Sequence, residues 1–301
     1  MQLLRTGKVK EVFEVSDKEL EFRFSDNISV FDKVIPTQVP KKGETLCRTS
    51  AHWFEVVEKE LGIPTHFLGL KGPDRMRVRR VEVVQVPDIT PDSTSFLIPL
   101  EVICRHYVAG SLHDRLKSGK IRARQLGFRT DDVPKYGTRL PEPFLEFTTK
   151  LEKTDRELSE AEAQAISKLS DDEFAELKDL VIEIDALIED EVAPRGLVHV
   201  DGKKEFGMDA DRQFMLLDTF GTADEDRWWD KAAYEANGET KELSKEFVRQ
   251  HYRATRYHEA LSEARAKGRP EPPIPPLPPD VTRQVTEIYV RLYERITGKP
   301  F

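Results

Sequence analysis

The sequence predicts an α+β fold with two lobes. Strand-like patterns crowd the first hundred residues, where charged and apolar residues alternate over 8–15 and again over 20–24. Helical spacing dominates the second half, most clearly over 171–192, where apolar residues recur along one stripe. Strands gathered in one part of a chain and helices in another are typical of the α+β class.

The patterns of the first half predict, in order, a hairpin, a helix, two strands and a short helix. The alternating segments form the hairpin, which turns near Ser16-Asp17. The longer helix stops at Gly62 and the short one at Gly119, since glycine commonly ends a helix. The expected ranges are 8–24 for the hairpin, 49–61 for the helix, 76–86 and 100–108 for the strands, and 111–117 for the short helix.

Helices are expected through most of the second half. One starts after Ser159, the longest covers 171–192, and another covers 242–255. A proline-dense tract over 270–279 then precedes a final helix, which Asp280 caps and which runs to residue 296. We interpret the tract as a stiff strap that lays the last helix against the body. Its PxxP spacings leave recognition by a partner domain as the alternative.

Composition excludes several classes of protein. The 301 residues carry a net charge of −8, with an isoelectric point near 5.6, which argues against nucleic-acid binding through phosphate contacts. Two cysteines indicate neither a disulfide framework nor a cysteine-rich zinc site. The N-terminus lacks the apolar core of a signal peptide, and no apolar run is long enough to cross a bilayer. We therefore expect a cytoplasmic protein with neither a nucleic acid nor a membrane as partner. A monomer and a homodimer both remain open.

A charged hairpin is expected directly after the longest helix. Because side chains alternate along a strand, Asp201, Lys203 and Glu205 share one face. A tight loop and a returning strand over 214–217 would set Lys203 opposite Asp218.

Two carboxylates would then flank an ammonium group on one face of this hairpin. Neighbouring carboxylates repel each other unless a cation lies between them, and their hard oxygen atoms suit Mg²⁺. The alternative is a surface hairpin with solvated charges. Against it, the charges interrupt apolar strands, and Gly207 indicates a bulge or a close backbone approach. We interpret Glu205 and Asp218 as ligands of a metal that accompanies a nucleotide.

Two further groups of residues are suited to binding anions. Gly7 opens the first strand, where Lys8 and Lys10 lie on the same face and supply point charges for phosphate. The chain contains neither a GxxxxGK[ST] nor a GxGxxG motif. In the second group, Arg105 shares a strand face with Glu101, and Ser111 stands where a helix begins. An arginine beside a helix N-terminus is a good receptor for phosphate or carboxylate. An edge strand in which Arg105 pairs with Glu101 is the alternative.

Together these stretches resemble the phosphoribosylaminoimidazole-succinocarboxamide synthase (SAICAR synthetase) family of purine biosynthesis. The resemblance runs in order from Gly7 to about Trp229, and the ordered set is far more specific than any one block. The matching stretches are GKVKEVFEV, SDNISVFD, IPLEVICRHYVAGS, FTTK, VDGKKEFG, and LLD followed by DRWWD.

The resemblance implies an ATP-dependent ligase that joins L-aspartate to the carboxylate of carboxyaminoimidazole ribotide (CAIR), with ATP and Mg²⁺ as cofactors. It also implies a two-lobed fold with an antiparallel sheet in the N-terminal lobe, an ATP cleft between the lobes and C-terminal helices. We expect residues 1–108 to form the nucleotide-binding lobe, 109–230 the central lobe with the magnesium and substrate site, and 231–301 a helical extension with the strap.

The family's roles can be carried over to matching residues. Lys203 and Arg105 would be catalytic, with Lys203 at the reacting centre. Lys8, Lys10, Glu205 and Asp218 would bind ATP, the two carboxylates through magnesium. The segment 81–84 is expected near the adenine. The substrate-binding residues implied are Ser25, Asp26, Ser29, Asp32, Glu101, Arg105, Ser111 and Arg227.

Two positions depart from the family pattern, and two other functions remain open. Thr219 follows Asp218 where many members have an acidic residue, and Thr154 precedes Asp155 where histidine is common. A small-molecule kinase would use the same lysines and metal ligands, although it needs no second anion receptor for an amino acid. A nucleotide-binding regulatory protein without turnover is the other alternative.

Overall fold

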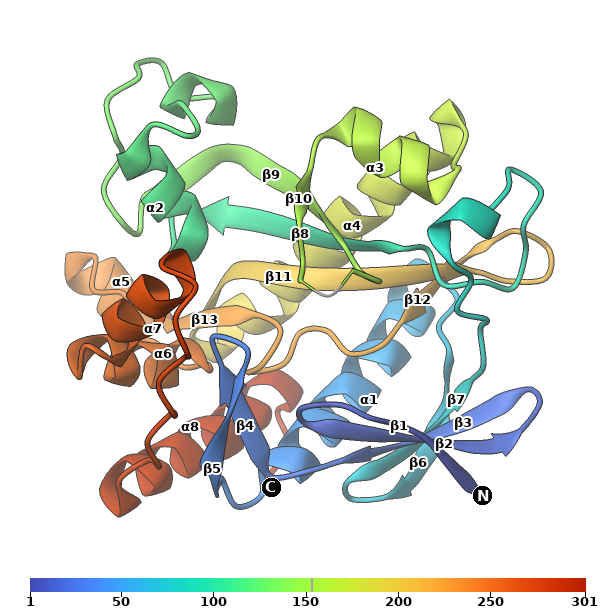
Figure 1. Ribbon diagram of the computed structural model, residues 1–301, viewed down its shortest axis with the longest axis horizontal. Coiled ribbons are helices and arrows are strands. Elements are labelled where there is room, and N and C mark those ends of the chain that lie inside the picture. The colour runs from blue at the N-terminus through green and yellow to red at the C-terminus, as the bar shows by residue number, and fades with distance from the viewer. Residues whose placement is uncertain (153) are drawn as a thin grey trace.

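Five antiparallel strands form the sheet of the N-terminal lobe (Figure 1). The computed structural model describes residues 1–152 and 154–301, and the order of this sheet is β1-β2-β3-β7-β6. Glu14 pairs with Leu20 across β2 and β3, so the predicted hairpin is confirmed. The strands are β1 (Gln2–Thr6), β2 (Lys10–Ser16), β3 (Glu19–Phe24), β6 (Phe67–Gly72) and β7 (Arg75–Arg79).

Helix α1 (Lys42–Leu61) packs against this sheet and begins well before the expected residue 49. The carboxylate of Asp26 accepts the backbone N–H of Gly43 at 2.9 Å, which satisfies one of the free donors of the first turn. Between β3 and α1, the hairpin of β4 (Asn27–Val30) and β5 (Lys33–Gln38) stands apart from the main sheet.

The long strand predicted over 76–86 is wrong. β7 ends at Arg79, and a 3₁₀ turn covers Val86–Asp88. The chain leaves the sheet because Glu82 pairs instead with the segment before β8: its N–H donates to the carbonyl of Ser95, and its own carbonyl accepts the N–H of Leu97. Alternation in the sequence does not show which neighbour a strand-like segment pairs with.

The second sheet has six strands and carries the charged hairpin. Its order is β10-β9-β8-β11-β12, and β13 also pairs with β11. β8 lies in the middle of this sheet, although residues 1–108 were expected to belong to the N-terminal lobe. The division of the chain into three parts stays a prediction. Helix α4 (Asp171–Val192) covers one face of β8 and β11 and matches its predicted range. The strands are β8 (Leu100–Tyr107), β9 (Arg139–Thr149), β10 (Glu157–Leu158), β11 (Leu197–Met208), β12 (Phe214–Leu217) and β13 (Arg227–Asp230).

Helices make up most of the C-terminal part, in which α8 lies along α1 (Figure 1). α8 begins after Pro278, so Asp280 lies in its first turn and does not cap it. Within the described residues, no helix has the length and apolar character needed to span a membrane. The remaining helices are α2 (Gly110–Ser118), α3 (Glu160–Ser167), α5 (Lys231–Asn237), α6 (Glu246–Ala254), α7 (Tyr257–Ala266) and α8 (Pro279–Thr297).

The proline tract packs along the body of the protein. The hydroxyl of Tyr252 donates to the carbonyl of Pro275 at 2.6 Å, and the N–H of Leu277 donates to the Thr37 hydroxyl at 3.0 Å. Ile274 and Leu277 are buried in the same core as α8. These contacts support the interpretation of the tract as a strap.

Leu277→Ala is expected to lower the free energy of unfolding by about 2–3 kcal/mol, because it removes a buried apolar side chain and leaves a cavity. Leu68→Ala is a matched control, since Leu68 is 41% exposed, and its effect should stay within about 0.5 kcal/mol. Urea unfolding of both variants measures the difference. Equal losses would show that the strap contributes no more than a surface residue.

Candidate active site

A cleft of about 1340 Å³ opens between the N-terminal sheet and the hairpin of β11 and β12. Lys8, Lys10 and Phe22 line it from the N-terminal lobe, and Lys203 and Asp218 line it from the second sheet. The segment 79–83 also lines the cleft. It includes residues 81–83 of the segment expected near the adenine. The sequence-predicted lysines and carboxylates therefore face one common space.

The register of the charged hairpin differs by one residue from the prediction. Glu205 pairs with Leu217 and Phe206 with Leu216, so Lys203 does not lie opposite Asp218. Asp218 follows the end of β12 in the left-handed region, with φ of 57°, an uncommon conformation for a residue other than glycine. The close approach expected at Gly207 is confirmed, because a Cβ there would lie 2.8 Å from the carbonyl oxygen of Phe96.

Ammonium groups and carboxylates alternate at the base of the cleft. Lys203 Nζ lies 2.8 Å from Glu101, 2.9 Å from Glu205 and 3.3 Å from Glu225. Lys150 Nζ lies between the two predicted metal ligands, 2.6 Å from Glu205 and 3.8 Å from Asp218. A cation thus already occupies the position between these carboxylates that electrostatics favours.

The lysines of the first strand reach the same cluster. Lys10 forms an ion pair with Asp218, and its Nζ lies 4.4 Å from the centre of the Phe22 ring. Lys8 pairs with Asp32 at 2.6 Å in a more exposed position. The central cluster contains four carboxyl groups and three lysines, so its formal net charge is −1; its members are Glu101, Glu205, Asp218, Glu225, Lys10, Lys150 and Lys203.

The charged groups of the cluster stabilise one another in their ionised forms. Burial by itself would raise the pKa of Asp218, but three lysines, led by Lys10, outweigh it and keep this pKa below its ordinary value. Burial would lower the pKa of Lys203, but the surrounding carboxylates, led by Glu205, raise it well above the ordinary value. Both groups are therefore charged at neutral pH.

Arg105, Ser111 and Arg227 come together around a residue that the sequence analysis did not single out as a ligand, Asp201. Arg105 donates to Asp201 at 2.9 Å and to the Ser111 hydroxyl at 3.1 Å, and Arg227 also pairs with Asp201. Glu146 forms a second ion pair with Arg105. The alternative in which Arg105 pairs with Glu101 on an edge strand is wrong, since β8 has neighbours on both sides.

The SDNISVFD segment divides into two parts. Ser29 and Asp32 line the cleft. The Ser25 hydroxyl donates to the carbonyl of Val9 at 3.1 Å, and the Asp26 carboxylate binds the start of α1, so these two side chains have structural partners. Substrate contacts by Ser25 and Asp26 stay predictions.

Several cleft residues were missed by sequence reasoning. Lys150 ends the FTTK stretch, which was noted only as part of the family resemblance, and Glu225 precedes DRWWD. Lys245 and Arg249 also line the cleft and come from the segment around α6. The sequence alone did not mark Lys150, because its place beside Glu101 and Glu205 follows from the pairing of β9 with β8.

Glu242 is a buried carboxyl group close to Arg227. Its Oε1 accepts a hydrogen bond from the Trp229 indole at 2.8 Å, while its Oε2 has no partner within the described part of the chain. Burial raises the pKa of Glu242 to about 8, against a partial opposing effect of Arg227. The folded protein therefore keeps this proton up to about pH 8, whereas the unfolded chain releases it near the ordinary value of 4.5.

Folding stability should consequently fall as the pH rises from about 4.5 to about 8, because the folded state binds the proton more tightly in that window. Glu242→Gln keeps an acceptor for Trp229 and removes the titration. Relative to the unmodified chain, its free energy of unfolding should increase between pH 5 and pH 9 by on the order of 2–4 kcal/mol. Chemical unfolding at pH 5, 7 and 9 measures this difference. Parallel pH profiles would contradict the assignment.

Comparison with known proteins bears directly on this site. A family model described as SAICAR synthetase matches residues 3–264. The phosphoribosylaminoimidazole-succinocarboxamide synthase of Thermoplasma acidophilum is 51% identical over 299 residues, which cover 99% of each chain. The chain belongs to the SAICAR synthetase family.

Solved structures of SAICAR synthetases have the same fold. One, a type-2 SAICAR synthetase in complex with ADP, is 25% identical, with a TM-score of 0.70 over 99% of this chain and 98% of the other. The SAICAR synthase of Saccharomyces cerevisiae, complexed with SAICAR, is 23% identical, with a TM-score of 0.76 over 99% and 95%. The family, the two-lobed α+β fold and the enzyme class, a phosphoribosylaminoimidazole-succinocarboxamide synthase, are therefore confirmed.

The two positions that we expect to depart from the family pattern lie near the cleft. Thr219 lines the cleft beside Asp218 and places a hydroxyl there. Thr154 is exposed, and the cleft is lined instead by its neighbour Asp155.

Proposed function

We propose that this SAICAR synthetase activates the carboxylate of CAIR with ATP in the cleft between the lobes and then transfers the activated group to L-aspartate. The observation that carries the proposal is the cluster in which Lys203 and Lys150 lie among Glu101, Glu205 and Asp218. Such a cluster combines cations for transferring phosphate with oxygen ligands for a metal ion.

The residues present fit a magnesium site. Glu205 is buried and Asp218 is half-buried, both are ionised, and the Lys150 ammonium between them stands in for a cation. We propose that these two carboxylates hold Mg²⁺ when nucleotide binds. The ion would neutralise charge on the β- and γ-phosphates. Thr219 could hydrogen-bond a water ligand of the ion.

The lysines have separate roles in this proposal. Lys8 and Lys10, on the N-terminal lobe, approach the nucleotide phosphates. Lys203 lies at the reacting centre, where an oxygen of the CAIR carboxylate forms a bond to the γ-phosphorus and ADP departs. The aspartate amine then forms a bond to the acyl carbon, phosphate leaves, and the amine gives up a proton. Positioning and charge stabilisation carry both steps, so no nucleophilic side chain is required.

The receptor around Asp201 supplies the second anion site. Asp201 and Lys203 lie two residues apart on one face of β11, a separation of about 7 Å. Arg105, Ser111 and Arg227 would therefore hold the phosphate or carboxylates of the acidic substrates close to the reacting centre. Glu146 and Asp201 orient the guanidinium groups.

A small-molecule kinase, the alternative function, would release ADP without aspartate. The ligase should release ADP only when ATP, magnesium, CAIR and L-aspartate are all present, with one amide formed per ATP. This follows because a water-sensitive acyl phosphate must be held until the amine arrives. A coupled ADP assay with and without aspartate, together with mass analysis of the product, tests the proposal. Full ADP release without aspartate, accompanied by a stable phosphorylated product, would contradict it.

A further inference from the structure

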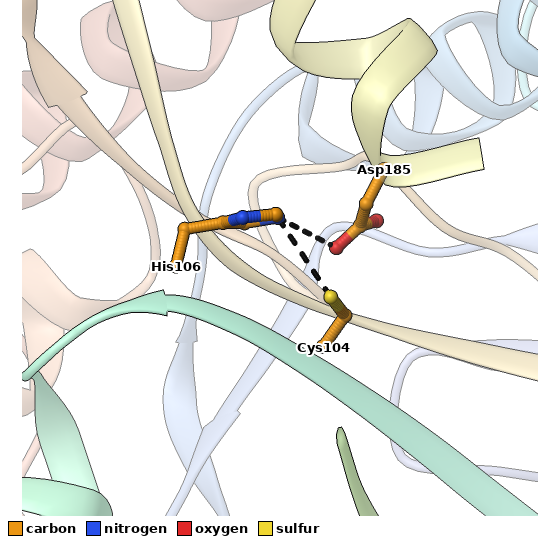
Figure 2. Close-up of side chains that lie close together, drawn as sticks. All are labelled: Cys104, His106 and Asp185. Atoms are coloured by element: carbon orange, nitrogen blue, oxygen red, sulfur yellow. Dashed lines mark hydrogen bonds and ion pairs between the residues drawn. The ribbon is translucent and has the colours of Figure 1, made fainter. Parts of the chain in front are cut away.

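A buried polar network lies behind β11, on the side away from the cleft. Figure 2 shows Cys104, His106 and Asp185 converging there, with His106 Nε2 3.1 Å from Asp185 and 3.8 Å from the Cys104 sulfur. These side chains are of the types that bind transition metals. The Lys204 ammonium, however, donates to the other oxygen of Asp185, so the network contains a cation of its own. Lys204 also approaches a second carboxylate, Asp226, at 3.8 Å.

Asp226 connects this network to the loop that precedes β13. Its Oδ1 accepts the backbone N–H of Gly221 at 2.7 Å, which closes the loop upon itself. Its Oδ2 lies 2.7 Å from His199 Nε2 on β11. The Asp226 side chain is fully buried. One carboxylate thus ties a cleft-lining loop to the back of the central strand.

Gly202 provides the space for this carboxylate. A Cβ at Gly202 would lie 1.9 Å from Oδ2 of Asp226, well inside van der Waals contact. The backbone of Gly202 is not in the left-handed region, so the glycine is required by this close approach and not by its own conformation.

The residues on either side of Asp226 face the cleft side of the same strand. Glu225 lies 3.3 Å from Lys203, and Arg227 pairs with Asp201. Consecutive side chains therefore alternate between the two faces of β11. Glu225 and Arg227 contact residues on the cleft side, and Asp226 contacts residues on the side away from the cleft. A shift of the Asp226 anchor would move both front contacts together.

We propose that Asp226 is a positioning residue for the ligase reaction, which seats Glu225 on Lys203 and Arg227 on Asp201 by anchoring the loop to Gly202, His199 and Lys204. The inference rests on the proposed role of Lys203 at the reacting centre. The Asp226 side chain is buried behind the strand and does not line the cleft. Its effect passes through the placement of its two neighbours.

Steady-state kinetics of Asp226→Asn tests the proposal, with Asp185→Asn as the matched control. Both changes remove a buried carboxylate next to Lys204, but only Asp226 holds the loop. Asp226→Asn should lower kcat by about 10-fold to 100-fold, as expected for a small misplacement of reacting groups. Asp185→Asn should keep kcat within about threefold of the unmodified chain. This holds even if its melting temperature falls as much as that of Asp226→Asn. The proposal is overturned if folded Asp226→Asn keeps normal kcat, or if the two variants lose kcat equally.

Further variants separate the possible failures. Lys203→Met should abolish turnover; if it remains active, the proposed role of Lys203 fails. If Lys203→Met is inactive while Asp226→Asn is normal, the positioning role alone fails. Gly202→Ala should reduce kcat in the unmodified chain and have a much smaller effect in an Asp226→Ala background, where the collision with the carboxylate at 1.9 Å is absent and only the contact with His199 at 2.9 Å remains. Equal effects in both backgrounds would overturn the coupling of Gly202 to Asp226.

Discussion

Glu205→Gln and Asp218→Asn should each lower kcat/KM by about 10²–10³-fold, which corresponds to a loss of roughly 3–4 kcal/mol of transition-state stabilisation. Each change keeps the shape of the side chain and removes a charge that we assign to the metal. The apparent magnesium requirement should rise at the same time. Initial rates measured over a range of magnesium concentrations give both quantities.

Glu183→Gln is a suitable control for these metal-site variants. Glu183 is exposed on α4, so the same chemical change there should leave kcat/KM within about twofold of the unmodified chain. The metal would have to lie elsewhere if Glu205→Gln and Asp218→Asn both retained normal turnover at low magnesium concentration.

Arg105→Lys should raise the KM for CAIR or aspartate, or lower kcat, by about 10-fold or more, while the affinity for ATP stays nearly unchanged. Lysine keeps the charge but cannot reproduce the planar fork that reaches Asp201, Glu146 and Ser111 together. Initial rates with each substrate varied in turn, and equilibrium binding of a nonhydrolysable ATP analogue, separate the two effects. A selective loss of nucleotide binding would place Arg105 at the ATP site instead.

The central chemistry of the site could be predicted from local sequence because it lies along one strand. Alternation alone places Asp201, Lys203 and Glu205 on one face of β11, and the structure shows Lys203 and Glu205 in contact. The long helix over 171–192 was equally predictable, since serine, three acidic residues and an apolar stripe specify its start and its buried face. Local patterns were sufficient wherever the contacts were local.

Contacts between distant segments could not be predicted in the same way. The turn between Met208 and Phe214, in which Arg212 is left-handed, sets the hairpin register, and no pattern in the sequence marks its length. Lys150 reaches Glu205 only because β9 pairs with β8, and β8 with β11. Asp226 could not be recognised as an anchor until Gly202 and His199 were placed beside it. Sheet order and loop placement, which depend on the whole chain, determine these contacts.

The fate of the carboxylate oxygens tests the central claim most directly, namely that the cleft phosphorylates CAIR before the amide forms. CAIR labelled with ¹⁸O in both carboxylate oxygens would be turned over with ATP, magnesium and L-aspartate, and the phosphate released would be analysed by mass. One labelled oxygen should appear in each phosphate, because the bond formed to phosphorus is later broken on its carbon side. Amide formation accompanied by unlabelled phosphate would contradict an acyl phosphate intermediate, and with it the roles proposed for the lysines and carboxylates of the cleft.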